Sequence, residues 1–344
     1  MSIQTVNGKI EKEDLGIVTP HEHIFINLCA FFEKKEIEHF QNPESTKIDI
    51  TNLGILNRDP YALKDNLLID DYETQKKEIL RFKEAGGKTI VDATTIGIGR
   101  NPLLLRKIAE ETGLNVICGA GFYVHSTHPN YLNIASVEEI AKKIEEEVTI
   151  GIDGTSVRAG VIGEIGISEL FHANERKVLH AAAIAAVKTG AGVLVHINPW
   201  TENGVEAAEI LLNSGVAPKK ICISHVDVEG KEPYIQKLVD MGVYVEFDNF
   251  GKEYFVDLKA RRPGYGLFMK DTERVALVKK LIDGGYDNQI LLSCDVCLKT
   301  TLRRYGGWGY DHVLTNIVPM MEEIGLNKNV IDKMLIDNPA DFLA

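Results

Sequence analysis

Two histidines lie two residues apart near the start of the chain, in the segment Gly16-Ile-Val-Thr-Pro-His-Glu-His-Ile. Side chains at positions i and i+2 of a strand point to the same side of it. His21 and His23 could therefore chelate one metal ion, while Glu22 points away from them. The pair alone is a weak signal, because neighbouring histidines are more often solvated or packed than bound to a metal. Its meaning depends on the other ligands that the chain offers.

Four more side chains that bind metals well each end a short apolar run, as at the end of a buried strand. Burying an imidazole or a carboxylate there is costly unless the group is paired or coordinated. One such residue could simply meet solvent or a neighbouring helix, but four in one chain are hard to explain in that way. The four are Glu164, His196, His225 and Asp295. With His21 and His23 they form a set that could hold two divalent cations side by side.

The composition limits the other possibilities. With 344 residues, of which 44% are hydrophobic, the chain can bury one large core. The net charge of −12 disfavours a nucleic-acid partner, and no apolar run approaches the roughly 18 residues of a membrane span. The first residues lack the apolar stretch of a signal peptide. We therefore expect a cytoplasmic protein that acts on a small molecule, with neither a membrane nor nucleic acid as its partner.

The five cysteines, an odd number in a long chain, are expected to be reduced thiols. Cys294-Asp-Val-Cys297 has the spacing of a redox motif, but such a motif opens a helix near the amino terminus of a small domain. This one brackets Asp295 at the end of a late strand. We therefore interpret both thiols as packing residues.

Strand-like and helix-like segments alternate along the chain. Runs rich in Val, Ile and Ala, typical of a covered parallel sheet, occupy residues 16–19, 89–93, 116–120, 159–164, 192–196, 221–225, 243–247 and 290–295. Segments of helical period lie between most of them and after the last, at residues 72–85, 101–112, 137–150, 174–190, 205–214, 231–241, 272–283 and 312–324.

Eight strand–helix units in a chain of this length predict a closed (β/α)8 TIM barrel, an α/β fold that forms a single domain over residues 1–344. A doubly wound open sheet is the alternative, but it would keep the first and last strands apart. In a closed barrel these strands are neighbours, so His21, His23 and Asp295 could meet at the carboxyl ends, where barrel active sites form. Residues 29–71 show no clear repeat and are expected to decorate the first loop.

Five motifs resemble those of a known family over nearly the whole length of the chain. They are Pro20-His-Glu-His, Gly119-Ala-Gly-Phe-Tyr-Val, Gly160-Val-Ile-Gly-Glu-Ile-Gly, Ser224-His-Val-Asp and Tyr305-Gly-Gly-Trp-Gly-Tyr. Together they resemble the phosphotriesterase family of the amidohydrolase superfamily, and within it the phosphotriesterase-related branch. The resemblance implies a homodimer and a binuclear metal site, most often of zinc, with manganese or cobalt as alternatives.

The resemblance also implies how the six ligands divide between two ions. The more buried ion would be held by His21, His23 and Asp295, and the more exposed one by His196 and His225. Glu164 would bridge the two ions, where phosphotriesterases proper have a carboxylated lysine. This departure argues against organophosphate triesters as the substrate.

The expected reaction follows from metal chemistry. Two cations lower the pKa of a water between them and so supply a bridging hydroxide near neutral pH. Asp295 would take its proton and pass it to the leaving group. The resemblance implies hydrolysis of a small anionic N-acyl amide, with N-acetyltaurine as the example, or of an ester. A lactonase that opens a sugar lactone, phosphorylated or not, is one alternative, and a metal-stabilised binding protein without catalysis is another.

Three side chains near the strand ends are candidates for substrate binding. Lys252 follows the seventh strand and Lys299 the eighth, and two ammonium groups above the metals would suit an anionic substrate. Each lysine could equally be solvated or paired with a carboxylate. Tyr123, after the third strand, could line the pocket or pack in the core. The sequence does not assign roles to His125, His128, Arg303 and Arg304.

Overall fold

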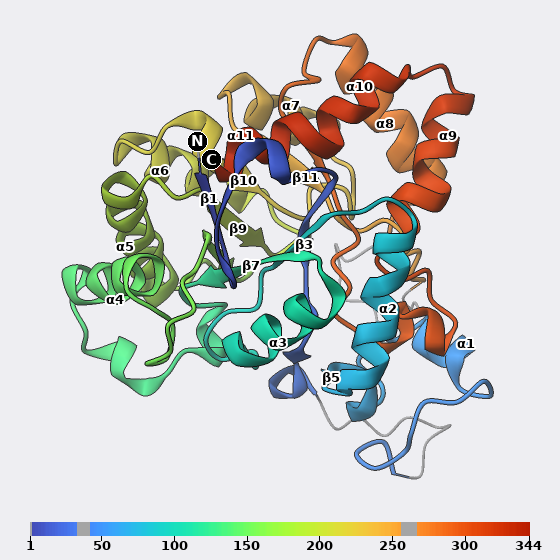
Figure 1. Ribbon diagram of the computed structural model, residues 1–344, viewed down its shortest axis with the longest axis horizontal. Coiled ribbons are helices and arrows are strands. Elements are labelled where there is room, and N and C mark those ends of the chain that lie inside the picture. Colours follow the sequence, from blue (N-terminus) through green and yellow to red (C-terminus); the bar gives the residue numbers. More distant parts are fainter. Residues whose placement is uncertain (1, 33–41, 256–266) are drawn as a thin grey trace.

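The computed structural model describes residues 2–32, 42–255 and 267–344. Eight parallel strands form one sheet, in which they are neighbours in chain order (Figure 1). These strands are β3 (Val18–Glu22), β6 (Thr89–Asp92), β7 (Asn115–Ala120), β8 (Val161–Ile167), β9 (Val193–Ile197), β10 (Ile221–Ile223), β11 (Tyr244–Phe247) and β12 (Ile290–Leu292). Each overlaps one of the eight predicted strands, and the differences are confined to the ends.

The sheet closes into a barrel where β12 meets β3. The backbone N–H of Asp295 donates to the carbonyl of His21 over 3.2 Å. The Ser293 hydroxyl accepts from the N–H of His21 at 3.0 Å and donates to its carbonyl at 2.6 Å. A doubly wound open sheet would not bring its first and last strands together in this way. The predicted (β/α)8 barrel is therefore confirmed.

Helices alternate with the strands and cover the outside of the barrel (Figure 1). They are α2 (Tyr72–Glu84), α3 (Pro102–Thr112), α4 (Val137–Thr149), α5 (Ala173–Thr189), α6 (Asn203–Asn213), α7 (Glu232–Asp240) and α8 (Asp271–Asp283). Local sequence explains where several of them begin and end. Asp71 and Ser136 cap α2 and α4 by accepting the N–H groups of Thr74 and Glu139. Gly113 takes the left-handed backbone conformation that ends α3.

The chain beyond β12 is more helical than the sequence indicated. The predicted helix at residues 312–324 consists of a π-helical turn, Val313–Ile317, that continues into α9 (Val318–Glu323). Further helical segments follow at α10 (Lys328–Asp332), a second π-helical turn (Lys333–Asp337) and α11 (Asn338–Leu343). At the other terminus, β1 (Ser2–Thr5) and β2 (Gly8–Glu11) form an antiparallel hairpin. The sequence reading missed this hairpin and the helices after residue 324.

The elements at the two termini close one end of the barrel. Ile3 of the hairpin and Phe342 of α11 pack against side chains in the barrel interior, and the two termini lie next to each other (Figure 1). The buried interior side chains in this cluster are Val18, Val91, Ala93, Ile117, Val161, Leu194, Cys222, Tyr244 and Leu291. Because this end is filled with apolar groups, the polar residues of the barrel gather at the carboxyl ends of the strands.

Part of the predicted first-loop decoration, residues 29–71, lies outside the described residues, at 33–41. The described part contains the short helix α1 (Leu53–Leu56) and the strand β5 (Leu68–Ile69). Strand β5 pairs antiparallel with β4 (Ile26–Asn27), just after the His-x-His motif. This segment therefore runs close to the predicted metal ligands.

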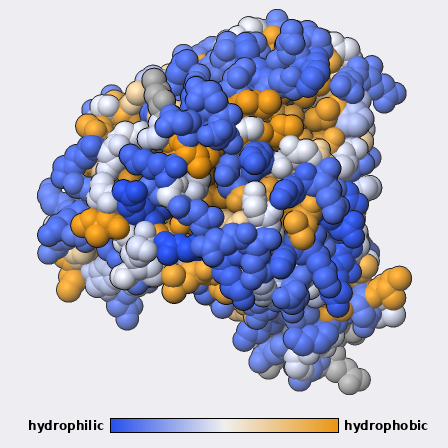
Figure 2. Space-filling model, viewed as in Figure 1, coloured by the Kyte–Doolittle hydropathy of each residue, from blue (hydrophilic) through white to orange (hydrophobic). Residues whose placement is uncertain are grey.

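The surface seen in Figure 2 is mostly hydrophilic, with apolar residues in several groups between the polar ones. Among the described residues, no helix combines the length and the apolar character needed to cross a lipid bilayer.

Candidate metal centre

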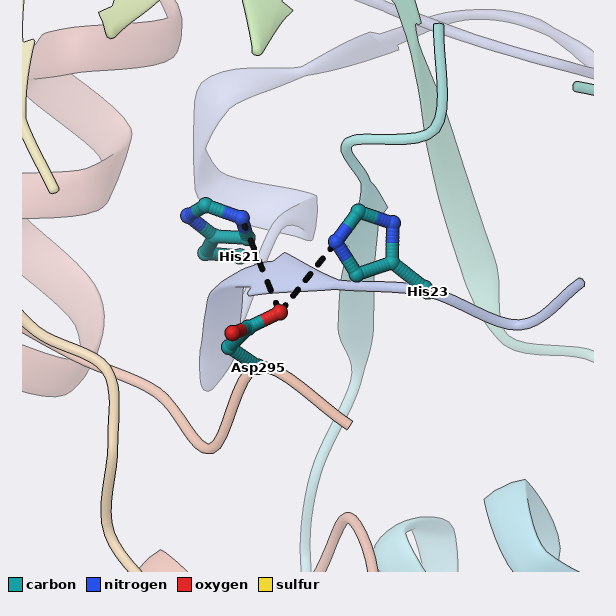
Figure 3. A group of neighbouring side chains, drawn as sticks. All are labelled: His21, His23 and Asp295. Carbon is teal, nitrogen blue, oxygen red and sulfur yellow. Dashed lines mark ion pairs between the residues drawn. The ribbon is translucent and has the colours of Figure 1, made fainter. Parts of the chain in front are cut away.

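The structure brings the six predicted ligands together at the carboxyl end of the barrel. They come from five strands or the residues that follow them: His21 and His23 (β3), Glu164 (β8), His196 (β9), His225 (after β10) and Asp295 (after β12). The imidazoles of His21 and His23 point to the same carboxylate, that of Asp295 (Figure 3). The Nε2 atom of His23 is 3.2 Å from Asp295 Oδ1, and that of His21 is 3.9 Å away.

Glu164 lies between the two sets of histidines. Its Oε1 atom is 3.3 Å from His23 Nε2, and its Oε2 atom is 3.5 Å from His21 Nε2. On the other side, Oε2 is 3.2 Å from His196 Nδ1 and 3.9 Å from His225 Nε2. Oε1 thus faces His23, and Oε2 lies between His21 and the other two histidines, so the carboxylate is close to the predicted ligands of both ions.

The donor atoms fit a metal site better than a hydrogen-bonded cluster. Two ligands of a tetrahedral zinc ion with bonds of 2.0–2.1 Å lie about 3.4 Å apart, which is close to the separations in this group. His21 Nε2 and Glu164 Oε2 are buried and make no hydrogen bond. An unpaired buried polar atom is costly. Cations between these atoms would remove that cost, so the residues present fit the binuclear group that the sequence predicts.

A second layer of polar groups orients the imidazoles through their other ring nitrogens. The Nδ1 atoms of three histidines contact oxygen acceptors: His21 with Glu246 at 3.1 Å, His23 with Thr94 at 2.9 Å and His225 with Asp248 at 3.0 Å. Histidines that bind metals through one nitrogen usually donate the other N–H in this way. The layer therefore leaves the Nε2 atoms of these three rings facing the centre.

Two of the predicted ligands are held in a strained backbone conformation. The φ angles of His225 and Asp295 are 61° and 45°, a region that costs a residue with a side chain about 1–3 kcal/mol. The Asp248 carboxylate accepts the N–H of His225 at 3.1 Å. Glu22 accepts the N–H groups on either side of Asp295, at 2.9 and 2.7 Å. The carboxylate of the His-x-His motif thus fixes the loop that carries the last ligand.

Charges within the centre are strongly coupled. Burial alone would lower the pKa of His23, but hydrogen bonds with Asp295 and Glu164 raise it to about 9. Burial would likewise lower the pKa of His225, but Asp248 raises it to about 10. Burial would raise the pKa of Glu164, yet the nearby imidazoles of His196 and His21 hold it well below its usual range. The buried carboxylates thus stabilise positive charge on the ring nitrogens, where protons would be exchanged for metal ions.

The centre lies at the base of a cavity of about 160 Å³. Its lining includes five of the six predicted metal ligands: His23, Glu164, His196, His225 and Asp295. The other described lining residues are Tyr61, Tyr123, Asn249, Lys252, Tyr254, Ile26, Leu28, Phe31, Pro60, Pro199, Val228, Phe268, Cys297 and Leu298. Lys252 is the one lysine or arginine among the described lining residues, and its ammonium group contacts the Asp295 carboxylate. The Tyr123 hydroxyl is 3.3 Å from the ring nitrogens of His196.

The other residues singled out in the sequence are absent from the described lining. Lys299, predicted to bind substrate, forms an ion pair with Asp65 at 2.8 Å. Arg303 pairs with Asp311 at 2.7 Å. The side chain of His125 stacks on His172, with ring centroids 3.5 Å apart. The remaining two are Arg304, whose guanidinium lies over the ring of Tyr305, and His128, which contacts the carbonyl of Tyr123 at 2.7 Å.

Sequence reasoning did not identify the second layer of the site. Its members are Glu22, Thr94, Ser224, Glu246, Asp248 and Asn249. One feature of the sequence could have identified two members of this second layer. Glu246 and Asp248 are acidic residues within or just after the apolar run Val243-Tyr-Val-Glu-Phe, and both are fully buried. A charged side chain buried within an apolar run needs an ion-pair or hydrogen-bond partner, just as a charged side chain at the end of such a run does.

Asp248 provides a test of this layer. Replacing Asp248 by Asn keeps the size of the side chain but removes the charge that faces His225 Nδ1 at 3.0 Å and His21 Nδ1 at 3.4 Å. We expect metal affinity to fall about 10- to 100-fold, measured by competition with a chromogenic chelator. Asp311→Asn removes a buried aspartate paired with Arg303 outside the centre. Equal affinities in the two variants would contradict the orienting role of Asp248.

Comparison with known proteins places the chain among hydrolases. Residues 1–343 match the phosphotriesterase family. An N-acetyltaurine hydrolase from Danio rerio is 38% identical over 352 residues, covering 99% of this chain and 97% of that protein. A resiniferatoxin-binding protein from Rhodobacter sphaeroides has a TM-score of 0.95 at 34% identity, covering 99% of this chain and 94% of that one.

A lactonase from Listeria monocytogenes has a TM-score of 0.80 at 26% identity, covering 100% of this chain and 99% of that one. These relatives match along the whole barrel, including the strands that carry the cluster of histidines and carboxylates. The chain therefore belongs to the phosphotriesterase family, which depends on two metal ions, and it is a metal-dependent hydrolase.

Proposed function

We propose that this chain hydrolyses a small anionic N-acyl amide, and that N-acetyltaurine is the first substrate to test. The observation that carries this proposal is the similarity to N-acetyltaurine hydrolases over almost the full length of both chains. The cavity supports it, because a single cationic side chain among its described residues, Lys252, lies next to the predicted metal ligands. A sulfonate or a similar anion could bind there while the acyl group faces the centre.

In this proposal two divalent cations, most suitably zinc, occupy the centre. His21, His23 and Asp295 would hold one ion, His196 and His225 the other, and Glu164 both. Imidazole nitrogens and carboxylate oxygens are ligands that zinc accepts readily, and manganese or cobalt could use the same set. The bound ions would supply an activated water and polarise the scissile carbonyl.

Residues of the chain would then carry out proton transfer and bind the substrate. Asp295 would take a proton from the attacking water and give it to the leaving nitrogen. Its Oδ2 atom contacts Lys252, while Oδ1 faces His23. Burial would raise the pKa of Asp295, but Lys252 and then His23 hold it below its usual range. Lys252 would also attract the substrate anion, and Tyr123 would form a wall of the site beside His196.

The test is acetate release from N-acetyltaurine by the zinc-loaded protein, followed by proton NMR. We expect release that depends on metal and is lost in the Glu164→Gln variant. Fully metallated protein that releases no acetate would overturn N-acetyltaurine as substrate. The matched control is Glu175→Gln, which alters a buried glutamate that accepts backbone N–H groups away from the cavity lining.

A lactonase is the second candidate, favoured by the similarity to the Listeria lactonase. An ammonium group in the cavity would suit the phosphate of a phosphorylated sugar lactone as well as a sulfonate. Lactone opening assayed beside acetate release decides between the two, since the faster reaction at equal metal content identifies the class.

A binding protein that uses metal only for stability is the candidate from another class. Removal of the metal by a chelator distinguishes it from an enzyme. If the ions are catalytic, activity disappears before the melting temperature falls; if they are structural, stability is lost together with any binding. We also propose a homodimer in the cytoplasm, and the five unpaired cysteines are consistent with a reducing compartment.

A further inference from the structure

Residues 42–67, which we call the cap, form a small unit beside the cavity. Leu56, Ala62 and Leu63 are buried together in a core of their own, with Ile48 and Ile55 packed against it. The cap contributes two residues to the cavity lining, Pro60 and Tyr61. A surface loop that has its own core can present side chains in a defined position.

The cap is attached to the loop after β12 by buried polar contacts. Lys299 Nζ is 2.8 Å from Asp65 Oδ1, and the two side chains are only 12% and 8% exposed. The neighbouring Asn66 is fully buried, and its side-chain oxygen accepts the N–H of Thr300 at 2.9 Å. Its amide group donates to the carbonyl of Pro60 at 2.8 Å. The contacts therefore lead from the β12 loop, through Asp65 and Asn66, to the residue before Tyr61.

Tyr61 belongs to the part of the cavity that holds Lys252. Tyr61 is 43% exposed as a whole, but desolvation of its hydroxyl raises the pKa of that group, and the Cys297 thiol, the Lys252 ammonium group and the Asp295 carboxylate act on it next most strongly. All four side chains line the same cavity. The phenol is therefore near the ammonium group and the predicted catalytic carboxylate, although it comes from a segment more than 180 positions earlier in the chain.

We propose that Tyr61 contacts the substrate next to Lys252 and determines which substrates fit, and that the Lys299–Asp65 ion pair is the positioning device that holds it there. Lys299 then acts on the substrate only through the cap, because its ammonium group is already bound to Asp65 and does not line the cavity among the described residues. The proposal rests on the proposed function for the identity of the substrate, but not for the placement of the cap.

The positioning role predicts a specific change in Lys299→Met. We expect KM for N-acetyltaurine to rise about tenfold, with a much smaller change in kcat, and metal content to stay constant. Amide hydrogen exchange in residues 57–67 should become about fivefold faster, because the cap opens more often. Lys299→Arg should restore both, since a guanidinium can pair with the same carboxylate.

A matched control comes from Lys47, which also contacts Asp65 Oδ1 at 2.8 Å but is 80% exposed. Exposed ion pairs contribute little, so Lys47→Met should leave KM and exchange close to those of the wild type. Equal effects of the two substitutions, or normal exchange in Lys299→Met, would overturn the positioning role. Exchange does not depend on any substrate, so this result stands even if N-acetyltaurine is not cleaved.

Contact of Tyr61 with the substrate is tested by binding rather than turnover. N-acetyltaurine is used as an inhibitor of 4-nitrophenyl acetate hydrolysis, and we expect its inhibition constant to rise about tenfold in Tyr61→Ala and less in Tyr61→Phe. An unchanged inhibition constant in Tyr61→Ala would overturn the contact. Absence of inhibition in the wild type would instead overturn the proposed substrate.

Discussion

Replacing Glu164 by Gln is expected to release metal from both sites and to lower kcat/KM by at least about a thousandfold, since metal ions contribute several kcal/mol to such reactions. The carboxylate faces both sets of histidines, with contacts of 3.2–3.5 Å to three imidazoles. A neutral amide can offer only one oxygen and carries no charge to balance two cations. Its NH₂ group would also face one of the ions.

Metal content by elemental analysis and activity measured on the same sample test this prediction. Glu175→Gln removes the charge of another buried glutamate, whose oxygens accept the N–H groups of His125, Ser168 and His172. It should keep both ions and most of the activity. If Glu164→Gln kept two ions per chain, Glu164 would not be the bridge, and the assignment of all six ligands would need revision.

The meeting of the six candidate ligands could be predicted from the sequence because barrel closure is a strong constraint. Each ligand ends or follows an apolar run, and a closed parallel barrel brings all such ends to one rim. His21 and Asp295 are 274 positions apart in the chain, yet they meet because the first and last strands pair. The order of the strands was sufficient for this, and no detail of any helix was needed.

The surroundings of the ligands could not be predicted in the same way, because they depend on which side chains meet. Glu22 was expected only to point away from the centre, whereas its carboxylate accepts the backbone N–H groups on either side of Asp295. Lys252 and Lys299 look alike in the sequence, each following a strand end. Only the fold reveals that Lys299 meets Asp65, 234 residues earlier, whereas Lys252 meets Asp295.

The elements that close the far end of the barrel were missed for a related reason. The hairpin of β1 and β2 has four-residue strands with mixed polarity, such as Gly8-Lys-Ile-Glu, which carry almost no periodic signal. The last helices are five or six residues long and are joined by π-helical turns. A period of 3.6 residues cannot be recognised over such short distances.

Asp295→Asn is expected to separate amide hydrolysis from easier reactions. An amine leaves only after it gains a proton, whereas 4-nitrophenolate leaves without one. The alkoxide of a lactone depends less on protonation than an amine does. Loss of a positioned acid–base group costs about 10²- to 10⁴-fold. We therefore expect kcat for N-acetyltaurine to fall about a thousandfold, and that for 4-nitrophenyl acetate or a lactone much less, measured at equal metal content.

Lys252 affects the comparison of Asp295→Asn with the wild type, because it forms a buried ion pair with Asp295. In Asp295→Asn the Lys252 ammonium group loses its carboxylate partner, and an unpaired buried charge destabilises a protein by about 3–5 kcal/mol. The double variant Asp295→Asn with Lys252→Met removes that charge and should regain stability without regaining kcat for the amide, compared at saturating substrate because the loss of Lys252 is itself expected to raise KM. If stability and amide turnover returned together, the loss of turnover in Asp295→Asn would come from the unpaired ammonium group of Lys252. Asp295 would then be a metal ligand without a role in proton transfer. If the amide and the ester lost rate equally in both variants, protonation of the leaving group would not be the step that Asp295 serves.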